Sequence, residues 1–210
     1  MTVKDKILAA LYAAENVYCN PECPLKGGSG YYQPIYLDHR NLLSCLKERD
    51  VVTGALRKLI EPDTALAGNE TAGIALAGLL ASDMDVPMLY VRKHRKEGGT
   101  KRQIEGTVPA GTKVCLIDDL AITGGNIERA IDVLRAEKLV VDTVVVISAA
   151  RPDVTARRLK ERGVTLQYLV SFQDIISWGE QHRKFTDVQK KSIHEYLDDP
   201  IHWGERHGFT

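Results

Sequence analysis

The chain has 210 residues, of which 44% are hydrophobic and 27% are charged, as is typical of one folded globular domain rather than of a disordered or fibrous chain. Its 28 Lys and Arg residues balance 28 Asp and Glu residues, which argues against a dedicated nucleic-acid-binding protein. The sequence holds no apolar run of the ~18 residues that a membrane-spanning helix needs, and its first residues lack a signal-peptide core. We therefore expect a cytoplasmic protein with no membrane partner.

The first predicted helix begins after Thr2, with Asp5 as its capping partner and apolar residues at helical spacing up to Tyr12. The Pro- and Gly-rich segment Asn20–Gly30 is predicted as loop. Cys23 of this segment and Cys19 just before it form a C-x3-C pair. Because the sequence holds no second pair of this kind, free thiols fit better than a structural zinc site.

Strands and helices then alternate along the chain. Strands are predicted at Pro34–Leu37, Thr64–Ala67, Pro87–Val91, Lys113–Ile117, Val141–Ser148 and Leu166–Val170, and helices at Arg49–Ile60, Ala72–Ala81, Asn126–Glu137 and Thr155–Arg162. Apolar, β-branched strands that alternate with helices predict an α/β fold with a mostly parallel sheet covered on both faces. In such folds ligands bind at the carboxyl ends of the strands.

The end of the chain departs from this alternation. Thr186 and Gln189 have the spacing of a capping box. The helix that they open has Val188, Ser192 and Tyr196 on one face and ends at Asp199-Pro200. We expect residues 173–210 to form a helical appendage that packs on the domain or on a partner subunit.

The segment 114–126, VCLIDDLAITGGN, is the most informative part of the sequence. An apolar strand ends in Asp118 and Asp119, and a Thr-Gly-Gly turn then leads into a helix. Such a turn presents unpaired backbone N–H groups and the positive end of the helix dipole, which suit a phosphate. Two carboxylates at the mouth of a strand suit sugar hydroxyls or a hydrated Mg²⁺. Together they predict a sugar-phosphate site.

A basic segment, 92–105, follows the strand Pro87–Val91 and holds six Lys or Arg against two Glu. Gly98 and Gly99 give its backbone freedom. Beside a phosphate site, such a loop can close over a polyphosphate and stabilise a departing pyrophosphate. A solvated surface loop is the alternative.

The segment 114–126 resembles the signature of the type I phosphoribosyltransferases, and the resemblance extends in order over residues 1–172. It implies a phosphoribosyltransferase domain there, with a central mostly parallel sheet and a small N-terminal hood. The acids would bind the ribose hydroxyls of phosphoribosyl pyrophosphate (PRPP). Its 5′-phosphate would be held by the turn, at Ala121, Ile122, Thr123, Gly124, Gly125 and Asn126. The family often has Thr at the position of Ile122.

The basic segment resembles the catalytic loop of the orotate-specific members. By that resemblance Arg92, Lys93 and Lys96 contact the pyrophosphate, and Lys96 joins Asp118 and Asp119 as a catalytic residue. The stretch 67–77 resembles the loop that binds pyrophosphate and the helix after it. Mg²⁺ is implied as a cofactor carried by PRPP, with water linking it to the two acids, and a homodimer is implied as the assembly.

Residues 29–38, SGYYQPIYLD, resemble the strand that packs on the base. The resemblance implies base contacts from Tyr36, Leu37 and Ile122, from Lys26, and from Arg151 toward the carboxylate of orotate. Lys26 lies three residues before Ser29, whereas the family has Lys directly before the Ser-Gly pair. Ala150 stands where the family often has an acid before its Arg.

The sequence therefore predicts an enzyme that transfers the phosphoribosyl group of PRPP to orotate in pyrimidine biosynthesis. Two alternatives remain open. The first is a phosphoribosyltransferase for another base. It would explain why Ile122, Lys26 and Ala150, all on the base side, differ from the pattern of the orotate-specific members. A regulator that binds PRPP or a nucleotide without catalysis would have less need of Lys96.

Overall fold

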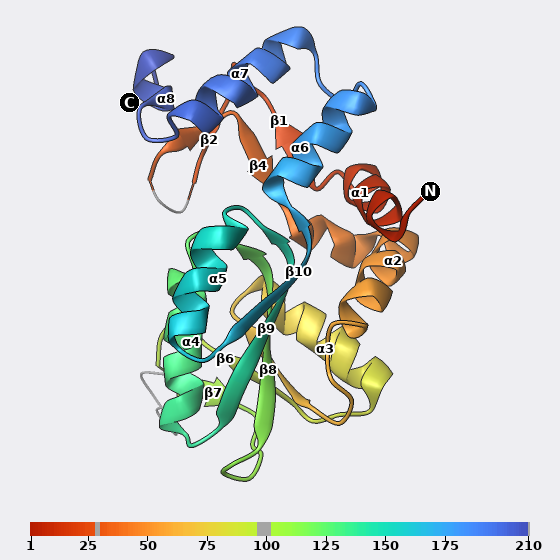
Figure 1. Ribbon diagram of the computed structural model, residues 1–210, viewed down its shortest axis with the longest axis vertical. Helices are drawn as coiled ribbons and strands as arrows, with labels where there is room; N and C mark the ends of the chain where they lie inside the picture. Colours follow the sequence, from red (N-terminus) through yellow and green to blue (C-terminus); the bar gives the residue numbers. More distant parts are fainter. Residues whose placement is uncertain (28–29, 96–101, 210) are drawn as a thin grey trace.

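The computed structural model describes residues 1–27, 30–95 and 102–209. Its centre is a six-stranded sheet with the strand order β10–β9–β8–β5–β6–β7 (Figure 1). The strands are β5 (Ala65–Asn69), β6 (Met88–Val91), β7 (Ile104–Glu105), β8 (Lys113–Ala121), β9 (Val140–Ala149) and β10 (Thr165–Ser171). All neighbouring strands are parallel except the β6–β7 pair at the edge. The predicted α/β fold with a mostly parallel sheet is confirmed.

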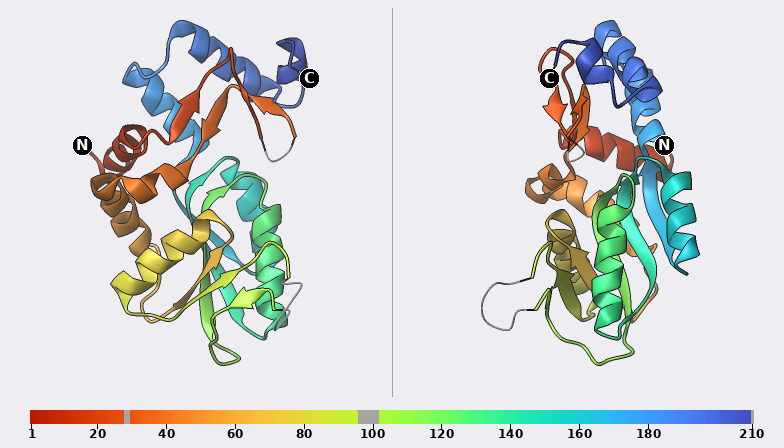
Figure 2. Two further views of the ribbon diagram at one scale, coloured as in Figure 1. Left: turned by 180° about the vertical axis from the view of Figure 1, so that it is seen from behind. Right: turned by 90° about the vertical axis from the view of Figure 1, so that its left-hand side faces the viewer.

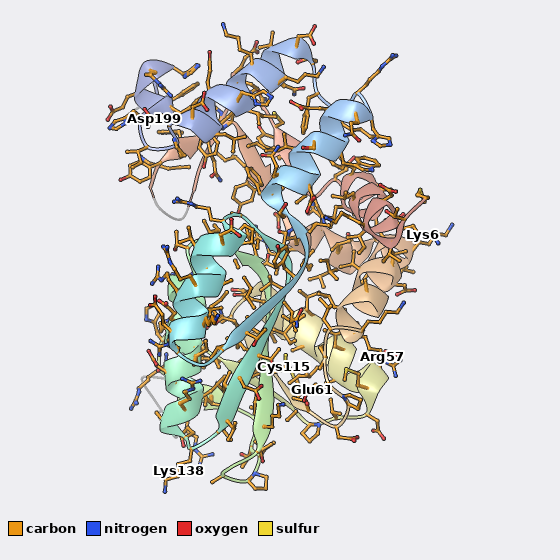
Figure 3. All side chains as sticks on the ribbon, viewed as in Figure 1. Lys6, Arg57, Glu61, Cys115, Lys138 and Asp199 are labelled. Atoms are coloured by element: carbon orange, nitrogen blue, oxygen red, sulfur yellow. The ribbon has the colours of Figure 1, made fainter. Side chains whose placement is uncertain are left out.

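Helices cover both faces of this sheet, as the side view in Figure 2 shows. One face packs against α1 (Val3–Ala13), α2 (Leu46–Arg57) and α3 (Ala72–Met84), and the other against α4 (Gly125–Ala136) and α5 (Pro152–Glu161). Strand β8 serves both cores, because alternate side chains point to opposite faces. Cys115 (Figure 3) and Ile117 face α3, whereas Val114 and Leu116 face α4.

The connections from the two central strands fix where a ligand can enter. The chain leaves β5 into α3 on one face and leaves the adjacent β8 into α4 on the other. Their loops therefore diverge at the carboxyl ends of the strands and open a crevice there.

A second layer, here called the hood, lies above the carboxyl ends of the strands (Figure 1). It contains the hairpin pairs β1 (Val17–Cys19) with β4 (Ile35–Leu37) and β2 (Leu25–Lys26) with β3 (Tyr32–Gln33). The helices α6 (Phe172–Gln181), α7 (Asp187–Asp198) and α8 (Trp203–Arg206) complete it, and the 3₁₀ helix η1 (His39–Ser44) leads back to the main body.

The C-terminal residues pack on the N-terminal strands of the same chain. Ile35 of β4 shares a buried cluster with Ile176, Phe185 and Ile193 from the C-terminal part. The Gln189 Nε2 also donates a hydrogen bond to the carbonyl of Cys19 at 2.7 Å. Residues 173–210 therefore join the hood, although a division of the chain into domains 1–172 and 173–210 stays a prediction.

Both predicted capping boxes are present, at Thr2–Asp5 and at Thr186–Gln189. Of the α7 residues expected on one face, Val188 is 67% exposed and Ser192 is buried. The loop prediction for residues 20–30 is wrong at β2, because a two-residue strand depends on its partner β3 rather than on its own pattern. Helix α6 and the strands β1 and β7 are not predicted from the sequence.

The predicted strand Lys113–Ile117 is too short. Strand β8 continues to Ala121, because Leu120 and Ala121 still pair with Ser148 and Ala149 of β9. Asp118 and Asp119 therefore lie within the strand and not beyond its end. None of the helices in the described ranges combines the length and the apolar character that a membrane crossing requires.

Candidate active site

A cavity of about 640 Å³ lies between the carboxyl ends of the central strands and the hood. Its floor is formed by the ends of β5 and β8 with the loops that follow them, and its opposite side by β3, β4, Phe172 and Tyr196. The volume is ordinary for a small-molecule site. The crevice predicted at the carboxyl ends of the strands is therefore present and is roofed by the hood.

The turn after β8 has the geometry of an anion site. Gly124 adopts φ +85°, a conformation that glycine tolerates and other residues resist. Helix α4 begins at Gly125, and no side chain caps it, so its first N–H groups have no side-chain partner. Thr123, Gly125 and Asn126 line the cavity at this point. The turn can therefore bind a phosphate through its N–H groups and the helix dipole.

Helix α5 supports this turn from the side away from the cavity. The Arg158 Nη1 donates to the carbonyl of Thr123 at 2.9 Å, while the same guanidinium pairs with Glu128 of α4. A Cβ on Gly124 would lie 3.3 Å from the Cγ2 of Thr155. The turn is thus held by side chains from two helices, which favours a preformed phosphate site.

Asp118 and Asp119 occupy different environments at the end of β8. Asp118 is buried, with its Oδ2 accepting from Asn69 Nδ2 at 2.7 Å and its Oδ1 accepting from the backbone N–H of Asp119 at 2.9 Å. Burial, together with the charge of Asp119, raises the pKa of Asp118 to about 8. Asp119 is half-buried and lines the cavity, so it is the more accessible acid for a sugar hydroxyl.

A hydrogen-bond network joins these acids to the start of the basic segment. Arg129 of α4 donates through Nη1 to the carbonyls of Arg92 and Lys93, at 3.1 and 3.4 Å, and through Nη2 to Asn69 Oδ1 at 3.5 Å. The N–H of Lys93 donates to Glu70 Oε2. The start of the basic segment is therefore fixed to the loop after β5 and to α4.

A buried polar pair lies on the hood side of β9. The Ser148 Oγ lies 2.7 Å from His39 Nε2, and Asn16, with its nitrogen turned to the carbonyls of Ala14 and Asp38, presents its oxygen to His39 Nδ1. Burial lowers the pKa of His39 to about 4, against the opposing effect of the Asp119 charge. His39 is therefore a neutral, fully hydrogen-bonded side chain at neutral pH and not a free acid or base.

The hood side of the cavity is mainly apolar and aromatic. Ile35, Tyr36 and Leu37 of β4 line it, together with Phe172 at the start of α6. Polar groups come from Gln33, from Tyr196 of α7, whose Oη donates to Gln33 Oε1 at 3.1 Å, and from the ion pair of Asp38 with Arg40. A planar ring fits between such walls, and few polar groups are needed to orient it.

The residues predicted from the sequence fall into three groups. Those that line the cavity are Tyr36, Leu37, Asp118, Asp119, Ile122, Thr123, Gly124, Gly125 and Asn126. Those that do not line it are Lys26, Arg92, Lys93, Ala121 and Arg151. Lys96 lies outside the described residues.

The second group has varied surroundings. Ala121 is fully buried, and Arg151 is exposed at the N-terminus of α5. Lys26 lines a neighbouring cavity of about 740 Å³, with its Nζ 4.9 Å from the centre of the Tyr32 ring. Arg92 and Lys93 are bound through their backbones to Arg129, as described above.

Sequence reasoning missed the roles of Gln33, Asn69, Arg129 and Tyr196. Asn69 lies in the stretch 67–77 that resembles the pyrophosphate loop. A polar residue at the buried end of a strand needs a hydrogen-bond partner, and this requirement could have indicated its role. Tyr196 lies 163 positions from Gln33 in the sequence, and the residues around it do not indicate that the two side chains meet.

Comparison with known proteins gives a consistent result. The family model described as a phosphoribosyl transferase domain matches residues 40–189. The orotate phosphoribosyltransferase of Allorhizobium ampelinum is 35% identical over 205 residues, covering 94% of this chain and 89% of that protein. The one from Cutibacterium acnes is 32% identical over 216 residues, covering 99% and 100%.

A solved structure agrees with these sequences. The orotate phosphoribosyltransferase from Aeropyrum pernix matches with a TM-score of 0.73 and 28% identity, over 86% of this chain and 99% of that chain. The chain therefore belongs to the phosphoribosyl transferase family, in which its relatives over nearly their full length are named orotate phosphoribosyltransferases.

Proposed function

We propose that this protein is an orotate phosphoribosyltransferase, a pentosyltransferase of pyrimidine biosynthesis. A ring nitrogen of orotate attacks C1 of PRPP, the bond from C1 to the pyrophosphate oxygen breaks, and orotidine 5′-monophosphate and pyrophosphate are released. The observation that carries the proposal is one cavity with a phosphate-binding turn and two acids on its floor and an apolar, aromatic wall opposite. The names of the full-length relatives support the choice of orotate.

The floor of the cavity suits the phosphoribosyl group. The N–H groups of the turn at Thr123–Asn126 would bind the 5′-phosphate, and Asp119 would accept hydrogen bonds from ribose hydroxyls. Positive charge develops at the sugar ring as the C1–oxygen bond breaks, and nearby carboxylates stabilise that charge. Here the protein acts by positioning and electrostatics, without a covalent intermediate.

The leaving pyrophosphate needs cations. Arg92, Lys93 and Lys96 are the proposed source, and the backbone of the first two is held by Arg129 and Glu70. These backbone contacts set where the basic loop leaves the sheet. Water exclusion by that loop would protect the sugar cation from hydrolysis.

Mg²⁺ is proposed to enter with PRPP and not to occupy a resident site. Within the described ranges, no group of three or more His, Cys, Asp or Glu side chains is arranged to hold a metal ion. Both Asp118 oxygens already accept hydrogen bonds, which leaves Asp119 as the nearer carboxylate for contact through water. Mg²⁺ prefers phosphate oxygens and retained waters, and when bound it would neutralise charge on the pyrophosphate.

A phosphoribosyltransferase for a different base is the second candidate. Ile122 lines the cavity with 54% of its surface exposed, and it cannot donate a hydrogen bond as the Thr common in the family can. Arg151, the residue that the resemblance pairs with the carboxylate of orotate, does not line the cavity. Both observations fit a neutral base.

The test is pyrophosphate release from PRPP with Mg²⁺ and one base at a time: orotate, uracil, adenine, hypoxanthine or guanine. Orotate-dependent release supports the proposal, and release with another base alone transfers the assignment to that base. If no base causes pyrophosphate release although PRPP binding is measurable, a regulator is favoured. Lys96→Ala should abolish turnover in either enzyme, whereas ligand binding by a regulator should barely change.

We also propose, from the resemblance, that the protein acts in the cytoplasm as a homodimer. Sedimentation equilibrium of the purified chain tests the assembly, since a dimer has twice the 23.3 kDa of one chain. A monomer at micromolar concentration would contradict it.

A further inference from the structure

The C-terminal helix α7 contributes a side chain to the candidate active site. Tyr196 lines the cavity, and its Oη donates a hydrogen bond to Gln33 Oε1 at 3.1 Å. Gln33 belongs to β3 near the N-terminus and lines the same cavity. Two segments far apart in the sequence thus form one polar element on the hood side of the cavity, which the Asp38–Arg40 ion pair also lines.

Gly27 provides the space in which the Gln33 amide lies. A Cβ on Gly27 would come within 3.3 Å of Gln33 Oε1 and 3.4 Å of its Nε2. The shorter distance is tighter than most Cβ contacts, so a side chain at this position would require the amide to shift by a few tenths of an ångström. Gly27 itself lines the cavity, and the amide is therefore fitted into its wall rather than projecting freely.

The C-terminal tail holds Tyr196 in this position. The fully buried Trp203 of α8 packs edge-on against the Tyr196 ring, with centroids 6.4 Å apart, and Phe209 stacks on Trp203. Asp199, labelled in Figure 3, pairs with Arg206 at 3.5 Å and so fixes the turn between α7 and α8. The tail thus serves to support the cavity wall.

The direction of the hydrogen bond sets the chemistry that Gln33 presents. Because Oε1 accepts the Tyr196 hydroxyl proton, the Nε2 end of the amide is the end left to donate. The ring carbonyls and the carboxylate of a pyrimidine such as orotate accept hydrogen bonds, whereas its ring N–H groups donate them. An oriented amide donor next to the flat apolar walls of Ile35 and Phe172 suits such a base.

We infer that Gln33 is a base-contacting residue of this enzyme, donating through Nε2 to a carbonyl or carboxylate oxygen of the base, and that Tyr196 is the positioning residue that orients it. This inference rests on the proposed function and deepens it. It gives the base side of the cavity a hydrogen-bond donor at a place where Ile122 supplies none. The phosphoribosyl side is not involved.

The test compares KM values for orotate and for PRPP in Tyr196→Phe, Gln33→Leu and the double variant. Loss of one neutral hydrogen bond corresponds to about a five- to tenfold effect. We expect each single variant to raise the KM for orotate by about that factor and to leave the KM for PRPP within about twofold. In the Gln33→Leu background, Tyr196→Phe should have no further effect, because a positioning residue acts only through its partner.

Tyr168→Phe is the matched control, because Tyr168 lies on β10 away from the cavity and is 38% exposed. Thermal melting of each variant separates a local effect from a loss of folding. Equal changes in both KM values, or an additive double variant, would overturn the inference. If the wild type uses another base instead of orotate, the proposed function fails, while the same comparison with that base still decides the role of the pair.

Discussion

The two sides of the cavity are built in opposite ways. The acids and the phosphate-binding turn of the floor come from one short stretch, in which Asp118, Asp119 and the turn up to Asn126 follow each other on β8 and α4. The base side is assembled from β3 and β4, the start of α6 and the last turn of α7. Functional groups that follow each other in the sequence are placed by the local structure of that segment. Functional groups from distant segments are brought together only by tertiary packing.

The two sides also differ in their electrostatics. The first has a buried acid of raised pKa, an accessible acid and a helix N-terminus. The second has apolar walls, one oriented amide and the Asp38–Arg40 ion pair. Substitutions on the first side should therefore affect the use of PRPP, and those on the second the choice and affinity of the base.

The largest effect is expected from Asp119→Asn. Removal of one electrostatic group from a transition-state site typically costs about 100-fold or more in rate. We expect kcat/KM for PRPP to fall by about that factor with little change in the KM for orotate, measured by initial-rate kinetics. Asp198→Asn, at an exposed position on α7, is the control. A variant with near-normal kcat would show that Asp119 is not at the reacting sugar.

Asp118 should make stability depend on pH. Its raised pKa means that between about pH 4 and 8 the folded protein keeps a proton that the unfolded chain has lost. The free energy of unfolding should therefore fall as the pH rises through this window, by up to about 1.4 kcal/mol per pH unit, about tenfold in the equilibrium constant. Asp118→Asn should remove that slope.

Urea unfolding of the wild type and Asp118→Asn at pH 6.5 and 7.5 measures this slope. His39 contributes in the opposite direction. Its lowered pKa stabilises the folded state above about pH 6.5, and this stabilisation is lost as the pH falls toward 4. Both proteins share this contribution, so it cancels in the difference between them. Parallel pH dependence in the two proteins would contradict the assignment.

Arg129→Met should weaken the link between the basic segment and the floor of the cavity. The side chain donates to two backbone carbonyls and to Asn69, and its loss leaves those acceptors without a charged donor. We expect about a fivefold rise in the KM for PRPP and no change in the KM for orotate. Arg157→Met, exposed on α5, is the control, and an effect on orotate alone would refute the assignment.

The smallest effect is expected from Ile122→Thr, which restores the residue that the family often has. A hydroxyl at this cavity position can donate to the base. If orotate is the substrate, its KM should fall about threefold while that of uracil is unchanged, as measured by initial rates with each base. A rise in the KM for orotate would favour the alternative of a neutral base.

Much of the fold followed from the sequence because strand and helix periodicity is local. The prediction ended β8 at Ile117, since charged residues normally terminate an apolar strand, but the ladder with β9 continues through Leu120 and Ala121. The two-residue strand β2 had no pattern of its own. Short strands such as this exist through their partners, which a single sequence does not identify.

The site divides in the same way. The sequence predicted a turn followed by a helix here because glycines before a helix have a local meaning, although α4 begins at Gly125, one residue earlier than predicted. Tyr196 and Arg129 could not be predicted, because on an isolated helix each is an ordinary polar residue. Only packing brings Tyr196 to Gln33 and Arg129 to the carbonyls of Arg92 and Lys93.

The central claim is that one cavity binds a phosphate on its floor and a base under the hood. Isothermal titration of the wild type with orotidine 5′-monophosphate, ribose 5-phosphate and orotidine tests it most directly. We predict that the nucleotide binds at least about tenfold more tightly than either fragment, because only the nucleotide reaches both sides. Ribose 5-phosphate binding as tightly as the nucleotide would contradict the claim, since the hood would then contribute nothing to recognition.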